Sequence, residues 1–298
     1  MKIIILIPIY NDWESSIKLL ENINSEVANL GYSFSVVIVN DASTENKPEF
    51  SNSLENLQFI KILNMKENRG HGRCIATGLK YIFEKEEFDY VMPMDGDGED
   101  KPEEIKQFVD NLNYNSDKPI VGERIKRSEG MFFKFCYSVH KLLTFSFTGK
   151  SIKYGNYSCL PKSIVEKMIN EKATWNSFSG SLAKVTKNRA SVPSIRGKRY
   201  FGPTKMNFVN LIKHSFSIMA VFKFNVLIRS ILFLIIYMYL ILQNISVITI
   251  IPFLIVIVMT IFIFLISRRE NIEELKNSLT NIADISIFKE NKNNLPSI

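Results

Sequence analysis

The 298-residue chain has little cysteine, and its three cysteines, Cys74, Cys136 and Cys159, lie far apart with no paired spacing. A disulfide framework or a cysteine-based zinc site is therefore not expected, and a reducing compartment suits the composition. Internal repeats and low-complexity linkers are also lacking. The apolar N-terminus has no small-residue cleavage site, so we interpret it as a first β-strand and not as a signal peptide.

Acidic residues are fewer than basic ones, at 30 against 37, which gives a formal net charge of +7. Such a balance suits an anionic partner, which could be a nucleotide, a phospholipid surface or a nucleic acid. Charge alone does not choose among these partners. The basic residues are dispersed and no nucleic-acid recognition module is found, so a nucleic-acid binder is disfavoured.

The first part of the chain alternates apolar runs with helical patterns. Runs typical of buried strands cover residues 2–10, 33–43, 59–65, 89–95 and 119–124, and helical patterns cover residues 13–30, 72–85 and 101–112. This alternation predicts an α/β fold with an open, mostly parallel sheet, in which ligands bind beyond the carboxyl ends of the strands. Residues 126–198 are expected to cover the sheet and to shape an acceptor site.

The last third of the chain is dominated by apolar segments. Residues 206–222 form an amphipathic pattern, which predicts a helix in the membrane interface or one packed on the soluble domain. Residues 224–242 and 245–266 are two apolar runs, and the second has no polar face. They could be buried core helices, but we expect a transmembrane hairpin, with Arg229 near its start able to reach the interface.

Basic residues flank this hairpin at both ends, and the turn between its helices has none. The positive-inside rule therefore predicts a multi-pass protein of the cell inner membrane, with its soluble part in the cytoplasm. The expected domains are a cytoplasmic domain at residues 1–200, a juxtamembrane helix at 201–223, two transmembrane helices at 224–267 and a cytoplasmic tail at 268–298.

An acidic cluster follows the fourth apolar run, in the stretch "DYVMPMDGDGEDKPEEI". Asp95 and Asp97 stand at alternate positions, Glu99 could add a third oxygen, and Gly96 and Gly98 allow a tight turn. Crowded carboxylates are costly unless they hold a cation, and Mg²⁺ or Mn²⁺ commonly binds one or two carboxylates together with substrate phosphates. An acidic turn on a solvated loop is the alternative, but the place after a buried strand favours a metal site.

Several short motifs occur in an order that resembles a family 2 glycosyltransferase. They are "IPIYND", "IVNDAS", "NRGHGRCIATGL", "MDGDGEDKPEEI" and "IVGER", followed by "GNYSCL" and "RYFGPTK". The sequence is similar to dolichyl-phosphate mannose synthases and bacterial polyprenyl-phosphate (bactoprenol) glucosyltransferases. The resemblance implies a nucleotide-sugar-binding domain of the GT-A type and an Mg²⁺ or Mn²⁺ cofactor.

The resemblance also implies roles for individual residues. Those matching the donor-binding loops are Pro8, Tyr10, Asp12, Val39 and Asp41. Those matching the metal and diphosphate site are Asp95, Gly96, Asp97 and Glu99. Those matching cations near the donor or acceptor phosphates are Arg124, Arg199 and Lys205, and together with Asp97 they form the expected catalytic set.

Each of these roles has a plainer alternative. Tyr10 could be packing at a strand end, Asp41 could form an Asx-turn, and Arg199 and Lys205 could contact only lipid headgroups. His71 is not expected to be a base. Relatives often carry Asp where this chain has Asn40, Gln where it has Glu99 and Arg where it has Ser158, and these departures lie mostly toward the acceptor.

The sequence shows no residue pair that would activate an acceptor hydroxyl. A phosphate monoester needs no such base, because its second pKa near 6 leaves it largely dianionic at neutral pH. We therefore expect an inverting, metal-dependent transfer from a UDP- or GDP-sugar to a polyprenyl phosphate among membrane lipids. Another membrane-bound glycan acceptor, a non-catalytic nucleotide-sugar-binding scaffold and a homo-oligomer remain open alternatives.

Overall fold

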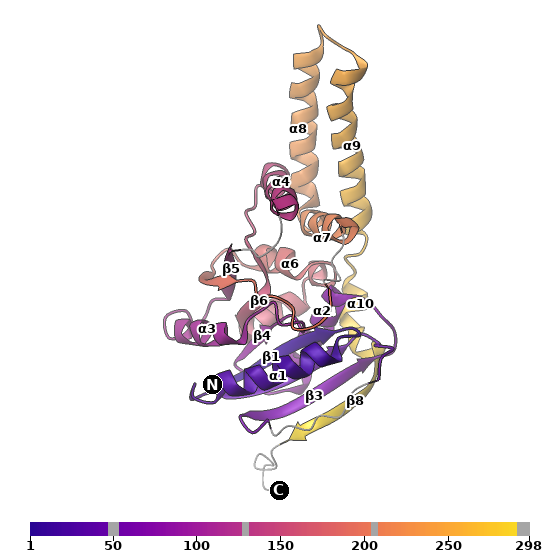
Figure 1. Cartoon of the computed structure of the whole chain (residues 1–298). Coiled ribbons are helices and arrows are strands. Elements are labelled where there is room, and N and C mark those ends of the chain that lie inside the picture. Colours follow the sequence, from indigo (N-terminus) through magenta and orange to yellow (C-terminus); the bar gives the residue numbers. More distant parts are fainter. Residues whose placement is uncertain (47–53, 127–130, 204–207, 291–298) are drawn as a thin grey trace.

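A computed structural model describes residues 1–46, 54–126, 131–203 and 208–290, and it contains one eight-stranded sheet with strand order β7-β5-β6-β4-β1-β2-β3-β8 (Figure 1). The strands are β1 (Lys2–Ile9), β2 (Ser33–Asn40), β3 (Leu57–Met65), β4 (Tyr90–Pro93), β5 (Ile120–Lys126), β6 (Tyr154–Pro161), β7 (Ala190–Ile195) and β8 (Ile282–Glu290). β4, β1, β2 and β3 run parallel, so the expected open and mostly parallel sheet is confirmed.

The central strand β1 is apolar on both faces because helices cover both sides of the sheet. Its residues Ile3, Ile5 and Ile7 pack on one side with α1 (Trp13–Val27) and α3 (Ile105–Leu112). The intervening Ile4 and Leu6 pack on the other side, against α2 (His71–Lys85). Such two-sided burial explains why the sequence shows a continuous apolar run here and not an alternating one.

The described part of residues 126–198 contains three α-helices, a short 3₁₀ helix and the strands β6 and β7. β6 runs antiparallel to both β4 and β5, and β7 pairs parallel with β5 at the edge of the sheet. Between them, α5 (Lys162–Ile169), the short 3₁₀ helix η2 (Lys172–Trp175) and α6 (Phe178–Val185) cover the same face as α2. The segment therefore covers the sheet only in part, as its strands β6 and β7 extend the sheet itself.

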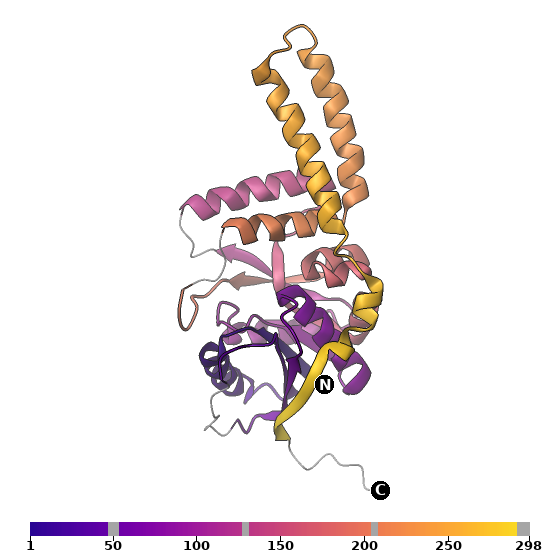
Figure 2. The same ribbon diagram turned by 90° about the vertical axis from the view of Figure 1, so that its right-hand side faces the viewer.

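Two further helices separate the sheet from the hairpin. α4 (Met131–Thr148) and α7 (Phe208–Ala220) lie across the base of α8 (Lys223–Ile241) and α9 (Val247–Ser267), as Figures 1 and 2 show. Phe147, Met219, Val226 and Ile263 form one buried cluster that joins all four helices. Arg229 donates a 3.0 Å hydrogen bond to the Ser146 carbonyl at the end of α4, so it links α8 to α4.

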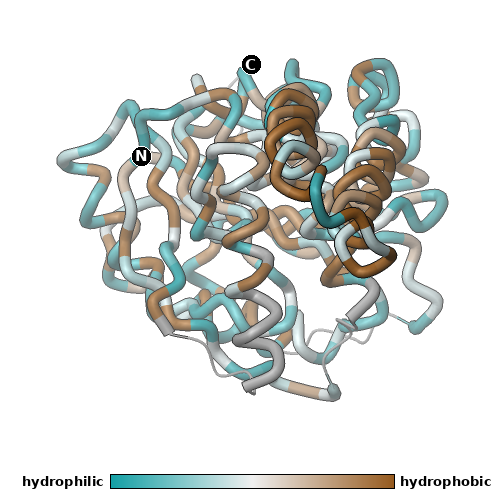
Figure 3. Tube along the Cα trace, turned by 90° about the horizontal axis from the view of Figure 1, so that it is seen from above, coloured by the Kyte–Doolittle hydropathy of each residue, from teal (hydrophilic) through white to brown (hydrophobic). Residues whose placement is uncertain are grey.

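The helices α8 and α9 are long and apolar enough to cross a membrane. At 1.5 Å per residue they span roughly 28 and 31 Å, close to the hydrocarbon thickness of a bilayer. Only 17% of the most apolar window of each is buried, which argues against a pair of soluble core helices. Figure 3 shows the apolar character of both along nearly their whole length.

The segment after α9 does not behave as the tail expected for residues 268–298. It returns to the soluble domain through α10 (Ile272–Lys276) and a 3₁₀ turn, and then forms β8, which pairs antiparallel with β3. The Trp175 indole donates a 2.7 Å hydrogen bond to Glu274 of α10. The last strand of the sheet is therefore formed by residues that follow the hairpin in the sequence.

Gly78 provides a test of the packing between α2 and the sheet. A β-carbon there would lie 2.3 Å from Leu6 Cδ1 and 3.0 Å from Val39 Cγ2, and both side chains are fully buried. We expect Gly78→Ala to destabilise the protein by about 1–3 kcal/mol through overpacking, which lowers the melting temperature in detergent by roughly 2–10 °C.

Gly72, also in α2, is the matched control for this variant. A β-carbon there meets only the Asn176 carbonyl oxygen, at an ordinary 3.7 Å. Gly72→Ala should leave the melting temperature at or above that of the wild type, since alanine favours a helix. Equal melting temperatures for the two variants would contradict the tight contact between Gly78 and β1.

Candidate functional site

The acidic loop, residues 95–100, begins two residues after β4 and lies at the carboxyl edge of the sheet. Gly98 has a φ of +85°, which favours glycine, and its α-carbon faces the ring of Tyr200 so closely that a β-carbon would be 2.4 Å from it. Gly96 packs against the carbonyl oxygen of Pro8 and the side chain of Ile9. The two glycines therefore let the loop lie flat between β1 and a later segment.

That later segment is residues 196–200, which we call the basic strap. Its backbone is hydrogen-bonded to the acidic loop twice, from the Gly197 amide to the Glu99 carbonyl (2.8 Å) and from the Tyr200 amide to the Asp97 carbonyl (3.0 Å). The Tyr200 hydroxyl also accepts a 2.8 Å hydrogen bond from Asn22 of α1. The strap follows β7, so the sheet order brings it to the acidic loop.

Arginines of the strap neutralise three carboxylates. Arg199 donates to Asp97 Oδ2 at 2.8 Å and to Asp12 Oδ2 at 2.5 Å, and Arg196 forms an ion pair with Glu99. The side chains of Arg199, Asp12 and Asp97 are each less than one-fifth exposed. Charged pairs with so little access to solvent interact more strongly than surface pairs.

Asp95 has different partners. Its Oδ1 lies 3.2 Å from His71 Nε2 and accepts a 3.1 Å hydrogen bond from the Asn156 amide, which is also 2.9 Å from the same histidine nitrogen. Partial burial disfavours both charges, but the attraction between them outweighs it, so the pKa of Asp95 is lowered and the pKa of His71 is raised. The contacts among Asp95, His71 and Asn156 join the acidic loop to the first turn of α2 and to β6.

Two other carboxylates in the loop, those of Asp97 and Asp100, are harder to ionise. Burial, followed by the charge of Asp95, raises the pKa of Asp97 to about 6 and that of Asp100 to about 7. Arg124 of β5 opposes the shift at Asp100, and the backbone amide of Asp95 donates a 3.0 Å hydrogen bond to the Asp100 carboxylate. The loop therefore concentrates negative charge that a cation would stabilise.

The residues expected to bind the donor lie beside this loop, at the ends of β1 and β2. Tyr10 is 42% exposed at the sheet edge, whereas Pro8 and Val39 are buried in their strands. Asp12 faces Arg199, as described above. Asp41 is only 3% exposed, and its carboxylate accepts hydrogen bonds from the amides of Arg69 and Gly70 at 2.7 and 2.8 Å, so it fixes the start of α2.

The expected catalytic residues are only partly brought together. Asp97 and Arg199 are in contact, while Arg124 stands on β5 near Asp100 and Gly155. Lys205 lies outside the described residues. Sequence reasoning missed Asn156, Arg196 and Asp100 as members of the site, and it dismissed His71 as a base without assigning it another role.

Asp95, Asp97 and Glu99, which were expected to share one ion, are each paired with a different basic side chain: His71, Arg199 and Arg196, respectively. Alternation of side chains holds only within a strand, and β4 ends at Pro93, before Asp95. Among the described residues, no group of three acidic, histidine or cysteine side chains is placed to hold a metal by itself. The carboxylates of Asp95 and Asp97 do suit a divalent ion that takes its other ligands from a diphosphate and water.

Comparison with solved structures identifies the fold. Glucosyl-3-phosphoglycerate synthase from Mycobacterium tuberculosis, in complex with Mn²⁺, UDP and phosphoglyceric acid, has a TM-score of 0.53 at 11% identity, covering 76% of this chain and 78% of its own. Mannosyl-3-phosphoglycerate synthase from Rubrobacter xylanophilus has a TM-score of 0.53 at 11% identity, covering 74% and 72%. This chain therefore shares the GT-A glycosyltransferase fold.

Sequence relatives point to the same group of proteins. Undecaprenyl-phosphate 4-deoxy-4-formamido-L-arabinose transferases of Salmonella paratyphi B and Salmonella newport are each 27% identical over 221 residues, which is 71% of this chain but only 64% of theirs. This chain thus matches less than two thirds of their length.

Residues 4–168 match the family described as glycosyl transferase family 2. Because this match spans more than half of the chain, from β1 to α5, the chain belongs to glycosyl transferase family 2.

Proposed function

We propose that the protein transfers a sugar from a nucleoside diphosphate sugar to a polyprenyl phosphate, with inversion at the anomeric carbon. The observation that carries this proposal is the position of the acidic loop, which contacts the basic strap on one side and His71, in the first turn of α2, on the other. Gly72, next to His71, lies against the backbone of Asn176, whose amide donates a 3.2 Å hydrogen bond to the Ser217 carbonyl of α7.

The donor would lie across the ends of β1 and β2. Tyr10 offers an exposed ring at this edge for the nucleotide, and Asp95 and Asp97 would hold a divalent ion together with the donor diphosphate. When bound, that ion would neutralise negative charge on the departing diphosphate. Arg199, which already spans Asp12 and Asp97, supplies a second positive charge at the same place.

The acceptor would supply its own nucleophile. A phosphate monoester is largely dianionic at neutral pH, so one of its oxygens can form the new bond to the anomeric carbon without a catalytic base. The bond from that carbon to the diphosphate oxygen breaks, and the nucleoside diphosphate leaves with the electron pair. The names of the Salmonella relatives, which act on undecaprenyl phosphate, support this acceptor class.

The hairpin would hold the site at the cytoplasmic face of the inner membrane. Lys223 is the first residue of α8, and Arg268 and Arg269 follow α9, whereas the turn between the helices has no basic residue. β8 pairs with β3 after the second helix, so both ends of the hairpin are tied to one soluble domain. A multi-pass protein with both termini in the cytoplasm accounts for these features together.

Asp97→Asn tests the proposed function directly. Removing this charge should lower the release of nucleoside diphosphate, measured with undecaprenyl phosphate and a panel of UDP- and GDP-sugars, by at least about 100-fold. Glu103→Gln, an exposed carboxylate nearby, is the charge-matched control and should keep near wild-type turnover. If the wild type turned over with a glycan acceptor but not with undecaprenyl phosphate, the proposed acceptor would be wrong. Unchanged turnover in the Asp97 variant would refute the proposed site.

A second test concerns the divalent ion. Treatment with a chelator should reduce turnover to background, because the ion would then no longer neutralise the negative charge of the leaving diphosphate. Adding Mn²⁺ or Mg²⁺ in excess should restore it, while the melting temperature without donor stays unchanged. Full turnover in excess chelator would rule out the ion.

The third test addresses the contact between the acidic loop and the strap. Gly98→Ala should displace Tyr200, because the new methyl group overlaps its ring and the φ of +85° is unfavourable for alanine. We expect faster tryptic cleavage at Arg196 and Arg199 and a roughly tenfold higher donor KM, from a cost of about 1–3 kcal/mol.

Gly31→Ala is the control for backbone strain in this experiment. Gly31 has a φ of +69° and nothing within 4 Å of its β-carbon position, far from the strap. This variant should keep the wild-type rate of cleavage in the strap. If Gly98→Ala also kept that rate, the strap would not depend on the acidic loop.

A further inference from the structure

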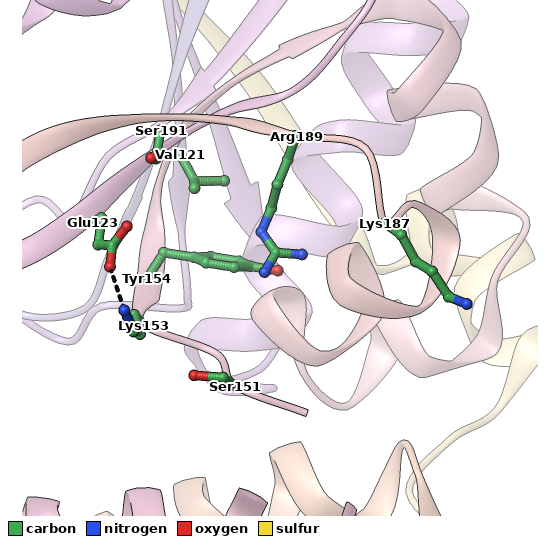
Figure 4. Close-up of a pocket in the computed structure, with 8 residues that line it drawn as sticks. All are labelled: Val121, Glu123, Ser151, Lys153, Tyr154, Lys187, Arg189 and Ser191. Atoms are coloured by element: carbon green, nitrogen blue, oxygen red, sulfur yellow. Dashed lines mark ion pairs between the residues drawn. The ribbon is translucent and has the colours of Figure 1, made fainter. Parts of the chain in front are cut away.

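A second polar pocket lies apart from the acidic loop, at the ends of β5, β6 and β7. Its volume is about 360 Å³, and its lining includes Val121 and Glu123 of β5, Tyr154 of β6 and Arg189 just before β7 (Figure 4). Side chains alternate along β5, so Glu123 faces this pocket while its neighbour Arg124 stands near Asp100. The pocket and the acidic loop therefore use opposite sides of the same strand.

Positive charge is in excess in this pocket. Lys153, Lys187 and Arg189 line it, and Glu123 is its one acidic lining residue within the described part of the chain. Glu123 forms an ion pair with Lys153 at 3.0 Å, with both side chains partly exposed. The charges of Lys187 and Arg189 are thus not balanced by any carboxylate of the described lining, and an anion would meet an attractive potential there.

Tyr154 forms a rigid wall of the pocket. The residue is 7% exposed, its hydroxyl donates to the Ser179 carbonyl at 3.4 Å, and its ring lies 5.2 Å from the Arg189 guanidinium. Stacking on an aromatic face holds an arginine in place while leaving its N–H groups available to a ligand. Ser151 and Ser191, which also line the pocket, offer hydroxyl donors.

The pocket lies next to the membrane-facing layer. Ser151 and Lys153 follow α4 directly, and the last residues of α4 are held by α8: the Thr148 carbonyl accepts a 3.1 Å hydrogen bond from Asn225. In Figures 1 and 2, β5 and β7 lie below the level of α4 and α7, on the side away from the hairpin. Phosphate groups of membrane lipids would be concentrated at this level of the protein.

We propose that this pocket is a second phosphate-binding site, separate from the donor site, in which Arg189, Lys187 and Lys153 bind the phosphate of an anionic membrane lipid or a free phosphate. Arg189 provides a planar pair of N–H donors suited to two phosphate oxygens. The lysines add charge, and the serine hydroxyls complete the donor set. Glu123 keeps Lys153 in place before the ligand arrives.

The test uses the full chain in a neutral detergent. Phosphatidylglycerol, phosphatidylcholine and inorganic phosphate are titrated separately, and bound lipid is counted by native mass spectrometry while the melting temperature reports binding of either kind of phosphate. The double variant K187Q/R189Q removes two pocket charges. The double variant K85Q/K167Q removes two charges from exposed lysines of α2 and α5 and serves as the matched control.

We expect wild type and K85Q/K167Q to retain phosphatidylglycerol in preference to phosphatidylcholine, and K187Q/R189Q to bind it about tenfold more weakly. Stabilisation by inorganic phosphate as well would identify the phosphate group itself as the ligand, whereas stabilisation by the lipid alone would identify a headgroup site. Equal binding by K187Q/R189Q and wild type, or an equal loss in K85Q/K167Q, would overturn the proposal. Glycosyl transfer measured in parallel separates this outcome from failure of the proposed function, because neither variant alters the acidic loop.

Discussion

Crowding of like charge after β4 is the constraint on which the rest of this structure depends. Asp95, Asp97, Glu99 and Asp100 fall within six residues, and such a group can persist in a partly buried place only with compensating charge. The compensation comes from far away in the sequence, through Arg196 and Arg199 of the strap and through His71. The fold therefore has to bring three distant segments to one edge of the sheet.

The antiparallel strand β6 makes this possible. Inserted between β4 and β5, it begins beyond the end of β4, so Asn156 reaches Asp95 while the parallel edge strand β7 delivers the strap to the same edge. An ordinary parallel strand at that place would have pointed its first residues to the opposite edge. The one reversal of direction in the middle of the sheet thus assembles the site.

The sharing of Arg199 between Asp12 and Asp97 also affects the free energy of ligand binding. A guanidinium held between two poorly exposed carboxylates has lost much of its water, and removing either partner would leave charge unpaired. A ligand that enters here must therefore bring charges that replace these contacts. The phosphates of the proposed donor could replace the carboxylates as partners of the strap cations. Donor binding would then depend on the arrangement of the strap.

The sequence predicted the parts of the fold in which local pattern and burial agree. β1, β2 and β4 are buried on both faces and therefore appear as continuous apolar runs, and the acidic loop was recognisable because it directly follows β4. β8 was missed because it is an edge strand with exposed residues such as Ile285, placed after the hairpin. The roles of Arg196 and Asn156 depend on strand order, which no local pattern contains.

The return of the chain to β8 has a consequence for biosynthesis. A ribosome makes β1 to β7 first, but the backbone groups of β3 on its outer edge have no strand partner until both apolar helices have been synthesised and β8 has emerged. An open edge of this kind can pair with other chains. With the membrane topology proposed above, insertion of the hairpin during translation would keep the nascent domain at the membrane surface until β8 covers this edge.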